Sequence, residues 1–421
     1  MATRVGEAKG SAPPSALLLA FPGPGFAPFD ELAGLSLVTR AVLTLQKAGL
    51  ERIRVIGPRE VQEPFARARD DARIQAELDF VECALRNEAL GALDAGPDQL
   101  LLVSSVEDVV DPAIYRALRE ATLGDALAVA ARDGEHWVGP FLTSGAGLAA
   151  LSGDEPRERV AALAAEGKIA SLDVGKAWHA RADGPAGRAR AVYLLFEACR
   201  KPVDGLVSRH LNRHVSIFIS KRLVSTPVTP NQMSLVTFVL GVAGAFAVSR
   251  GGYVWSLLGA VLFQWNSILD GVDGELARVR FQHSKLGQWV DTVCDDVSNV
   301  IFYIGLAFGA SGLAHGQLLA SAGWIAAGAT LLTMAQYYVE LVRIGSGDFY
   351  ALSVGVPKSP GGFVGAVVGL FERVLKKDFF IFLFLCMAVA GVLPYATVLA
   401  AFGASIALGS ATVRNVRRLA A

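Results

Sequence analysis

The second half of the chain carries a series of long apolar segments, and these restrict the possible folds more than any other feature. We count about six of them, each near the roughly 20 apolar residues that a helix needs to cross a bilayer. Their approximate ranges are 232–249, 253–270, 287–310, 317–341, 379–394 and 396–413. Hydrophobic residues make up 52% of the chain, and its mean hydropathy is +0.42. We therefore expect a multi-pass integral membrane protein with a soluble part.

The loop charges predict how these segments are oriented in the cell membrane. Basic residues gather at one side of the predicted spans, as is typical of the cytoplasmic side. These residues are Arg343, Lys358, Arg373, Lys376, Lys377, Arg414, Arg417 and Arg418. The opposite side has Arg250, His315 and little else. The N-terminal run "SALLLAF" is broken by "PGPG" and is too short for a secretory signal. The first half of the chain is thus expected in the cytoplasm.

Residues 15–198 have the pattern of a soluble α/β domain, preceded by a disordered N-terminus at 1–14. Buried strands are predicted at 15–21, 52–57 and 98–106. Asp111 is a candidate N-cap for the helix that follows, with Pro112 at its first position. Strands that alternate with helices indicate a mainly parallel, Rossmann-like sheet. The net charge of zero gives no reason to expect nucleic acid. The four cysteines form no CxxC pair, which argues against a disulfide framework or a zinc site.

Residues 199–228 link the two halves and read as an amphipathic helix lying on the membrane surface, followed by a short linker. Apolar side chains are mixed with basic ones over a helical length, so contact with membrane lipid is expected. Its polar face comprises Lys201, Asp204, Arg209, Asn212 and Arg213. This face is open to two interpretations: a site for an anionic acceptor or lipid head group, or general attraction to acidic lipid.

Four aspartates lie at the cytoplasmic ends of the second and third apolar segments. Asp270 and Asp273 are spaced i, i+3, and Asp291 and Asp295 are spaced i, i+4, so on helices each pair shares one face. Four carboxylates that converge would repel one another unless cations were bound. Carboxylate oxygens favour Mg²⁺, Mn²⁺ or Ca²⁺, and two ions are plausible for four such ligands, an arrangement that serves phosphate chemistry. Small residues and one arginine stand at intervals among them: Gly271, Gly274, Ala277, Arg278 and Gly287.

The spacing of these residues resembles the CDP-alcohol phosphotransferase family over roughly residues 200–420. The resembling pattern is Asp270-x-x-Asp273-Gly274-x-x-Ala277-Arg278, then Gly287, Asp291 and Asp295 at fixed intervals. The resemblance implies an all-α membrane domain of six helices, 229–421, that joins a phospho-alcohol to a second alcohol and releases CMP. It implies that the four aspartates hold Mg²⁺ or Mn²⁺ and that Asp295 is also the general base. It further implies a cytidine site at Gly274 and Ala277, a donor-phosphate contact at Arg278, and a homodimer.

Other residues near the pattern are candidates for binding the substrates. Asn231 and Pro230 resemble the entry to the family's first span and could border the nucleotide pocket, although Pro230 could simply begin a helix. We add Gly287 to the donor-binding set. A phosphate on the acceptor would need cations, and the candidates are Lys285, Arg280, Arg209 and Lys358, with His283 nearby. Asp296 lies outside the pattern and is either a supporting residue or a solvated neighbour.

The first domain resembles the sugar-phosphate nucleotidyltransferases. "LLLAFPGPGFAP" and "LLLVSSVEDVVDP" occur in that family's order. Gly23 and Gly25 remain in the first loop, but Phe26 replaces its phosphate-gripping end, and no Lys or Arg follows before Arg40. Glu107 or Asp108 could take the acidic metal-binding position. We therefore expect the fold without robust cytidylyltransferase activity. The two-domain order resembles the bifunctional inositol-phosphate cytidylyltransferase/di-myo-inositol phosphate phosphate synthases.

The leading hypothesis is a membrane-embedded CDP-alcohol phosphotransferase that uses an inositol phosphate or another polar alcohol. A phospholipid synthase that uses CDP-diacylglycerol is the alternative within the same chemistry. A hypothesis of another class is a non-catalytic membrane receptor or transporter with a nucleotide-sensing cytosolic domain. The last predicts metal-independent binding and no CMP release.

Overall fold

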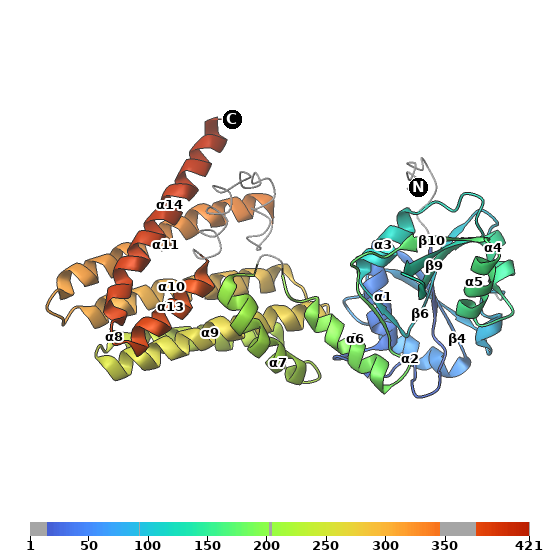
Figure 1. Ribbon diagram of the computed structural model, residues 1–421, viewed down its shortest axis with the longest axis horizontal. Helices are drawn as coiled ribbons and strands as arrows, with labels where there is room; N and C mark the ends of the chain where they lie inside the picture. Colours follow the sequence, from blue (N-terminus) through green and yellow to red (C-terminus); the bar gives the residue numbers. More distant parts are fainter. Residues whose placement is uncertain (1–14, 92, 202–203, 346–375, 421) are drawn as a thin grey trace. The chain divides into compact units, whose positions relative to one another are not determined.

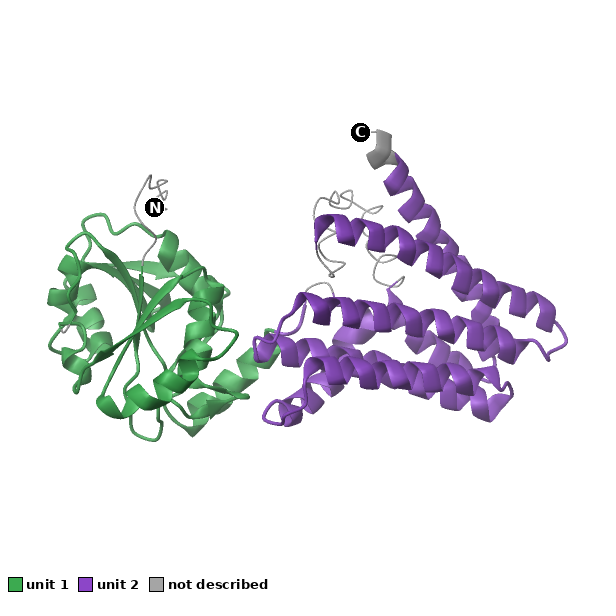
Figure 2. Cartoon of the chain, turned by 180° about the vertical axis from the view of Figure 1, so that it is seen from behind, with its two compact units in different colours: residues 1–198 green, residues 199–421 purple. Residues whose placement is uncertain are grey.

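The computed structural model describes residues 15–91, 93–201, 204–345 and 376–420, and the chain divides into two compact units, 1–198 and 199–421 (Figures 1 and 2). Each unit has a hydrophobic core of its own. Two sequence predictions, the disordered segment 1–14 and the acceptor-site residue Lys358, lie outside the described residues.

The first unit is built on a seven-stranded sheet with the order β10-β8-β9-β6-β1-β4-β5. These strands are β1 (Ser15–Leu19), β4 (Arg52–Gly57), β5 (Glu77–Glu82), β6 (Leu100–Ser105), β8 (Ala128–Asp133), β9 (His136–Ser144) and β10 (Ile169–Asp173). β9 runs antiparallel to β6 and β8, and the other neighbours pair in parallel. The predicted α/β domain with a mainly parallel sheet is confirmed.

Helices cover both faces of this sheet, which explains the continuous apolar run of β1. Leu18 belongs to one core cluster and Leu19 to the other. A strand buried on both faces reads as an uninterrupted apolar run rather than an alternating one. The helical elements are α1 (Leu37–Lys47), α2 (Arg59–Arg69), η1 (Arg86–Glu88), α3 (Pro112–Glu120), α4 (Gly145–Leu151), α5 (Pro156–Ala165) and α6 (Pro185–Glu197).

Short strands and a helix cap complete the first unit. Two further two-stranded sheets are formed by β2 (Glu31–Leu32) with β3 (Leu35–Ser36), and by β7 (Asp108–Val110) with β11 (His179–Arg181). The side chain of Asp111 accepts a hydrogen bond from the Ala113 N–H at 2.8 Å, and Pro112 is the first residue of α3. The predicted N-cap is thus confirmed.

The second unit is helical (Figure 1). A short π-helical turn, η2 (Ser208–Asn212), leads into α7 (Arg213–Leu223) in the predicted interfacial segment. The helices that follow are α8 (Pro230–Ser249), α9 (Tyr253–Val279), α10 (Lys285–Ala310), α11 (Gly316–Ile344), α13 (Lys377–Val389), η4 (Leu393–Tyr395) and α14 (Ala396–Ala420). Pro230 does begin a helix, and Thr229 and Gln232 form a capping box around it with hydrogen bonds of 2.9 and 3.3 Å.

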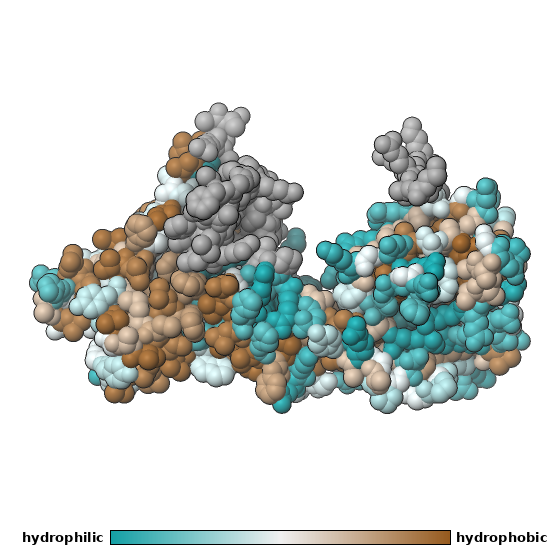
Figure 3. All heavy atoms as spheres, in the orientation of Figure 1, coloured by the Kyte–Doolittle hydropathy of each residue, from teal (hydrophilic) through white to brown (hydrophobic). Residues whose placement is uncertain are grey.

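Four helical segments in the described residues are long and apolar enough to cross a membrane: α8, α10, α11 and Leu393–Val416. This number supports an integral membrane protein, while the count of six spans stays a prediction. The surface of this unit in Figure 3 is largely apolar over its helices, whereas the surface of the first unit is largely polar. α9 continues to Val279, well past the predicted end at 270. The first aspartate pair therefore lies within a continuous helix rather than at its end.

Glycines let α8, α9 and α10 approach closely. A Cβ on Gly259 of α9 would lie 2.6 Å from the Gly244 carbonyl oxygen of α8. A Cβ on Gly305 of α10 would lie 2.3 Å from the Ala245 carbonyl oxygen, also on α8. Close backbone approach at small residues is how membrane helices gain packing energy. This packing brings the aspartate-bearing helices α9 and α10 against one common neighbour.

Candidate active site

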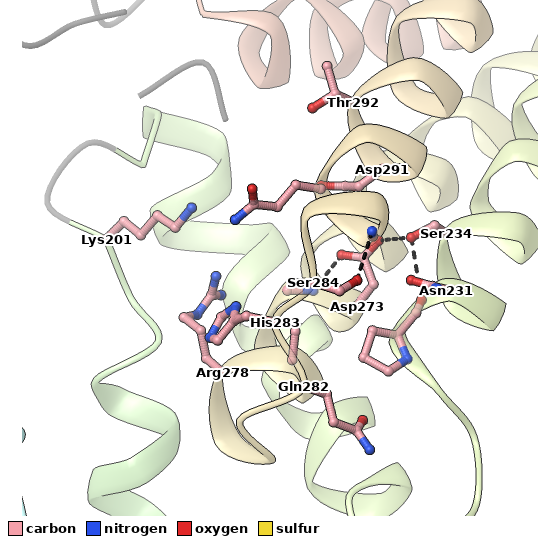
Figure 4. Close-up of a pocket in the computed structure, with 15 residues that line it drawn as sticks. Lys201, Asn231, Ser234, Asp273, Arg278, Gln282, His283, Ser284, Asp291 and Thr292 are labelled. Atoms are coloured by element: carbon pink, nitrogen blue, oxygen red, sulfur yellow. Dashed lines mark hydrogen bonds between the residues drawn. The ribbon is translucent and has the colours of Figure 1, made fainter. Parts of the chain in front are cut away.

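A cavity of 320 Å³ lies where α8, α9 and α10 meet near the aspartates (Figure 4). It includes one aspartate of each predicted pair, Asp273 from α9 and Asp291 from α10. The full lining consists of Lys201, Pro230, Asn231, Ser234, Asp273, Gly274, Ala277, Arg278, Gln282, His283, Ser284, Gly287, Gln288, Asp291 and Thr292. Five residues predicted to bind the donor, Asn231, Gly274, Ala277, Arg278 and Gly287, are thus gathered around one space.

Asp273 is held in place by groups from its own helix and from α8. It is 3% exposed, and its carboxylate accepts hydrogen bonds from the Ser234 hydroxyl at 2.6 Å and from the Gly274 N–H at 2.5 Å. Its side chain also hydrogen-bonds to that of Asp291. Two carboxyl groups can share a hydrogen bond only if one of them is protonated and donates. The two aspartate pairs therefore do meet, as the helical spacing predicted.

The other two motif aspartates, Asp270 and Asp295, are not part of the cavity lining. Asp270 is close enough to Asp295 and Asp291 to be repelled by both. The Asp295 carboxylate is ion-paired with the ammonium group of Lys377, the first residue of α13. Lys377 also interacts with the charges of Asp270 and Asp296. A lysine that is distant in sequence thus balances part of the acidic charge, a contact that the sequence pattern did not reveal.

The four aspartates offer the kind of ligand that a hard divalent cation prefers. Among the residues that the structure describes, however, no three His, Cys, Asp or Glu side chains are grouped so that they could hold a metal ion. Several of these carboxylates already have partners, because Lys377 is ion-paired with Asp295 and Asp273 contacts Asp291. The oxygen ligands that the four aspartates supply fit a hard divalent cation.

Gly287 proves to be a contact position with α8 rather than with α9. A Cβ there would lie 2.9 Å from the Ser284 hydroxyl and 3.0 Å from the Asn231 side-chain oxygen. The atoms nearest to Gly287 thus belong to Asn231 on α8 and to Ser284, which precedes α10. Because Gly287 has no Cβ, Asn231 and the start of α10 can lie close together at the cavity. Ser284 caps α10 by accepting from the Gly287 N–H at 2.9 Å.

A buried ion cluster beneath the motif was missed by the sequence analysis. Glu275 is 0% exposed and accepts hydrogen bonds from Arg213 at 2.9 Å and from Ser216 and Ser220, each at 2.7 Å. Arg213 also donates two hydrogen bonds to the Asp204 carboxylate, at 2.9 and 3.0 Å. Asp204 and Arg213, which were predicted to lie on the polar face, are thus ion-paired inside the protein. The available signal was a glutamate inside the motif itself, between Asp273 and Arg278.

Gly271 and Asn212 belong to the same packing between η2, α7 and α9. A Cβ on Gly271 would lie 3.1 Å from both Arg213 and Ser216, so this glycine admits the α7 side chains rather than a ligand. Asn212 donates to the Ser267 hydroxyl at 3.1 Å and accepts from Gln264 at 2.9 Å. The segment is therefore fixed to α9 by polar contacts, in addition to whatever it makes with lipid.

The predicted acceptor-site cations are not brought together. Arg280 is 5% exposed and donates to the carbonyls of Leu223, Val224, Thr226 and Val228 at 2.6–2.8 Å. It holds the turn between α7 and α8, which corrects its assignment to the acceptor. Lys285 is exposed at the start of α10, and Arg209 is exposed on η2; neither lines the cavity. Asp296 accepts from the Tyr338 hydroxyl on α11 at 2.9 Å, a supporting contact.

In the first unit, the acidic residues at the end of β6 are enclosed by arginines. Glu107 is 1% exposed and pairs with Arg86 at 2.5 Å and with Arg181 at 3.5 Å. Burial raises the pKa of Asp108 to about 6, which the nearby charge of Arg157 opposes. In the first loop, Phe26 is 7% exposed and exchanges backbone hydrogen bonds with Gly23 at 3.1 and 3.2 Å. Glu107 is thus ion-paired with the protein's own arginines, and Phe26 is packed into the first loop.

Fold and cavity together define the class: a helical unit with segments long and apolar enough to cross a membrane, a cavity that contains carboxylates and an arginine, and an α/β unit in the same chain. Residues 227–408 match the family model described as CDP-alcohol phosphatidyltransferase. The "Bifunctional IPC transferase and DIPP synthase" of Rubrobacter xylanophilus is 30% identical over 361 residues, which covers 76% of this chain and 81% of that protein. The chain therefore belongs to the CDP-alcohol phosphatidyltransferase family, as the motif spacing predicted.

The similarity is not confined to the membrane unit. The match to the Rubrobacter protein covers more of the chain than the second unit contains, so it extends into the first unit. The protein of the same name from Thermococcus kodakarensis is 46% identical over 121 residues. That alignment spans 29% of this chain and only 27% of the relative's length. The structure of the inositol-1-phosphate CTP transferase from T. maritima matches with a TM-score of 0.34 and 11% identity, over 42% of this chain and 92% of that one.

Proposed function

We propose that this protein transfers a phospho-alcohol from a CDP-alcohol to the hydroxyl group of an acceptor and releases CMP. The observation that carries the proposal is the shared cavity. It joins carboxylates from two helices, Asp273 and Asp291, to an arginine and to small residues that leave room for a nucleotide. Such a site can hold a pyrophosphate between positive and metal-binding groups. The site and the first unit would face the cytoplasm.

The motif residues take distinct roles in this reaction. Asp270, Asp273, Asp291 and Asp295 would hold divalent cations, Mg²⁺ or Mn²⁺, whose charge would stabilise the phosphate oxygens. Asp295 takes the proton of the acceptor hydroxyl, whose oxygen then bonds to the phosphorus of the donor while the bond to CMP breaks. Arg278 contacts the donor phosphate. Gly274, Ala277, Asn231 and Gly287 shape the nucleotide end of the cavity. Two copies of the chain would form a homodimer.

We propose an inositol phosphate, or a similar polar alcohol, as a substrate. The names of the relatives with the two-part arrangement support this choice. The internal pairing of Glu107 and the buried Phe26 support a first unit that does not itself make the CDP-alcohol. The donor would then come from a separate cytidylyltransferase reaction.

The test is an assay of the purified, full-length protein with Mg²⁺, a panel of CDP-alcohols and a panel of acceptors. CMP release that requires both substrates and the metal is the expected result. Radiolabel from the donor should stay in the water phase; label in the lipid extract would instead indicate a phospholipid synthase that uses CDP-diacylglycerol. Nucleotide binding without metal and without CMP release would contradict the enzyme and favour a receptor or transporter.

A further inference from the structure

One cation in the cavity lies outside the family motif: Lys201, from the segment that precedes η2. In Figure 4 it reaches from the side opposite Asp273, Ser234 and Asn231 toward α10. Arg278 and His283 lie on the same side of the cavity as Lys201. The cavity is therefore polarised, with Asp273 and Asn231 on one wall and the cations Lys201 and Arg278 on the other. A group with several negative oxygens would bridge the two walls once cations were bound at the acidic one.

The backbone around Lys201 is fixed to the motif helix by a chain of contacts. The Lys201 N–H donates to the Asp204 carboxylate at 2.9 Å, and Asp204 in turn receives two hydrogen bonds from Arg213. Arg213 is bonded to Glu275, which stands between Asp273 and Arg278 in the motif. Lys201 is thus positioned by the same helix that carries the acidic wall, and its place in the cavity is part of the fold.

Arg278 contacts the same segment through Cys199, and one of its nitrogen atoms has no hydrogen-bond partner among the described residues. Its guanidinium hydrogen-bonds to the thiol of Cys199, which is 2% exposed. Its Nε is buried and has no hydrogen-bond partner among the residues that the structure describes. A buried donor without a partner carries a free-energy cost. Arg278 lines the cavity on the same side as Lys201 and is therefore a second cation available to an anion there.

We infer that Lys201 binds a phosphate of the nucleotide-diphosphate donor and forms, with Arg278, the anion-binding wall of the donor pocket. The ammonium group of a lysine acts as a flexible point charge, which suits a phosphate that changes position when CMP departs. The inference rests on the proposed function, because it names the group that Lys201 contacts in that reaction. It also means that the donor pocket is completed from outside the family's motif, by the segment that leads into the membrane unit.

The experiment compares the binding of CDP and of cytidine to the purified full-length protein in Mg²⁺, by isothermal titration calorimetry. Lys201→Met should raise the Kd for CDP roughly tenfold, equivalent to about 1.4 kcal/mol, and leave the Kd for cytidine unchanged. Lys201→Arg should restore most of the CDP affinity. Lys221→Met, an exposed lysine of α7 outside the cavity lining, is the matched control and should bind CDP as the wild type does.

The outcomes separate this inference from the proposed function. If Lys201→Met binds CDP with wild-type affinity, or loses CDP and cytidine equally while melting like the wild type, Lys201 does not bind the phosphate and the inference is wrong. Either result would leave the proposed transferase intact. A wild-type protein that binds neither CDP nor cytidine would overturn the proposed function and this inference together.

Discussion

Asp295 differs from the other motif aspartates in its partner. Asp273 and Asp291 line the cavity and contact each other, whereas Asp295 is paired with Lys377 from α13. Asp295 lies outside the lining that holds Asp273 and Asp291, so the proposed base is separate from the carboxylates at the proposed donor site.

Asp295→Asn is expected to abolish CMP release while leaving CDP-donor binding largely intact. An amide cannot take up the hydroxyl proton, and the loss of a general base typically costs about 10²–10⁴-fold in rate. The measurement is CMP release together with the Kd of the donor. Asp273→Ala serves as the contrast and should lose metal and donor binding together. If Asp295→Asn weakened binding and turnover by the same factor, Asp295 would not be the base.

Lys377→Met is expected to tighten Mn²⁺ binding. The measurement is electron paramagnetic resonance, which reports the concentration of free Mn²⁺. The lysine ammonium competes with a metal ion for the charge of Asp295 and its neighbours, so its removal should lower the metal Kd by roughly tenfold. Lys377→Arg keeps the positive charge and should retain wild-type affinity. Unchanged or weaker Mn²⁺ binding in Lys377→Met would show that the lysine does not compete for this site.

Residue spacing identified the cavity groups because the family motif lies within two neighbouring helices. Helical periodicity alone placed Asp270 with Asp273 and Asp291 with Asp295, and the structure brings one member of each pair into the cavity. Periodicity could not assign Arg280 or Lys377, because their partners come from a turn and a helix that are distant in the chain. Charge alone made Arg280 look like a substrate ligand; only its carbonyl partners reveal a structural role.

At the level of elements, the packing of α7 against α9 depends on a buried ion cluster. Arg213 joins Asp204 to Glu275, and two serines of α7 complete the hydrogen bonds of the glutamate. Burial of such charges is costly unless each is paired. The amphipathic pattern predicted this segment as a helix but assigned its arginine to the membrane surface. The reason is that the partner Glu275 lies beyond the second apolar segment, inside the aspartate motif, where periodicity gives no hint of a contact with α7.

Glu275→Ala is expected to destabilise the protein by about 3–5 kcal/mol, because it leaves the buried charge of Arg213 only partly compensated. The measurement is the thermal unfolding midpoint of the purified protein in detergent. Glu275→Gln keeps the shape of the side chain and its hydrogen bonds, so its unfolding midpoint should lie between those of Glu275→Ala and the wild type. Glu166→Ala removes an exposed ion pair with Lys168 and should leave the midpoint unchanged. If Glu275→Ala had the same thermal unfolding midpoint as the wild type, the cluster would have no structural role.

At the level of the whole molecule, the two units differ in how completely the sequence predicted them. The α/β class of the first unit follows from apolar strands that alternate with helices, and the antiparallel strand β9 is the part that such a pattern cannot reveal. The membrane unit follows from segment length, but α9 extends beyond the apolar run because its polar end is buried against α7 and α8. The proposal that the first unit does not make the donor rests on contacts of Glu107 and Phe26, which the strand and helix pattern cannot reveal.

The full-length protein is accordingly expected to release no pyrophosphate from CTP and inositol phosphate in Mg²⁺ above a control without protein. The loop after β1 carries no Lys or Arg of its own, and Glu107 is ion-paired with Arg86 and Arg181. The same preparation, given the CDP-alcohol directly, should release CMP when an acceptor is added. Pyrophosphate production that depends on both CTP and the phospho-alcohol would show that the first unit is active despite these contacts. Because the two reactions release different products, one preparation assayed for both distinguishes a single-activity transferase from a bifunctional one.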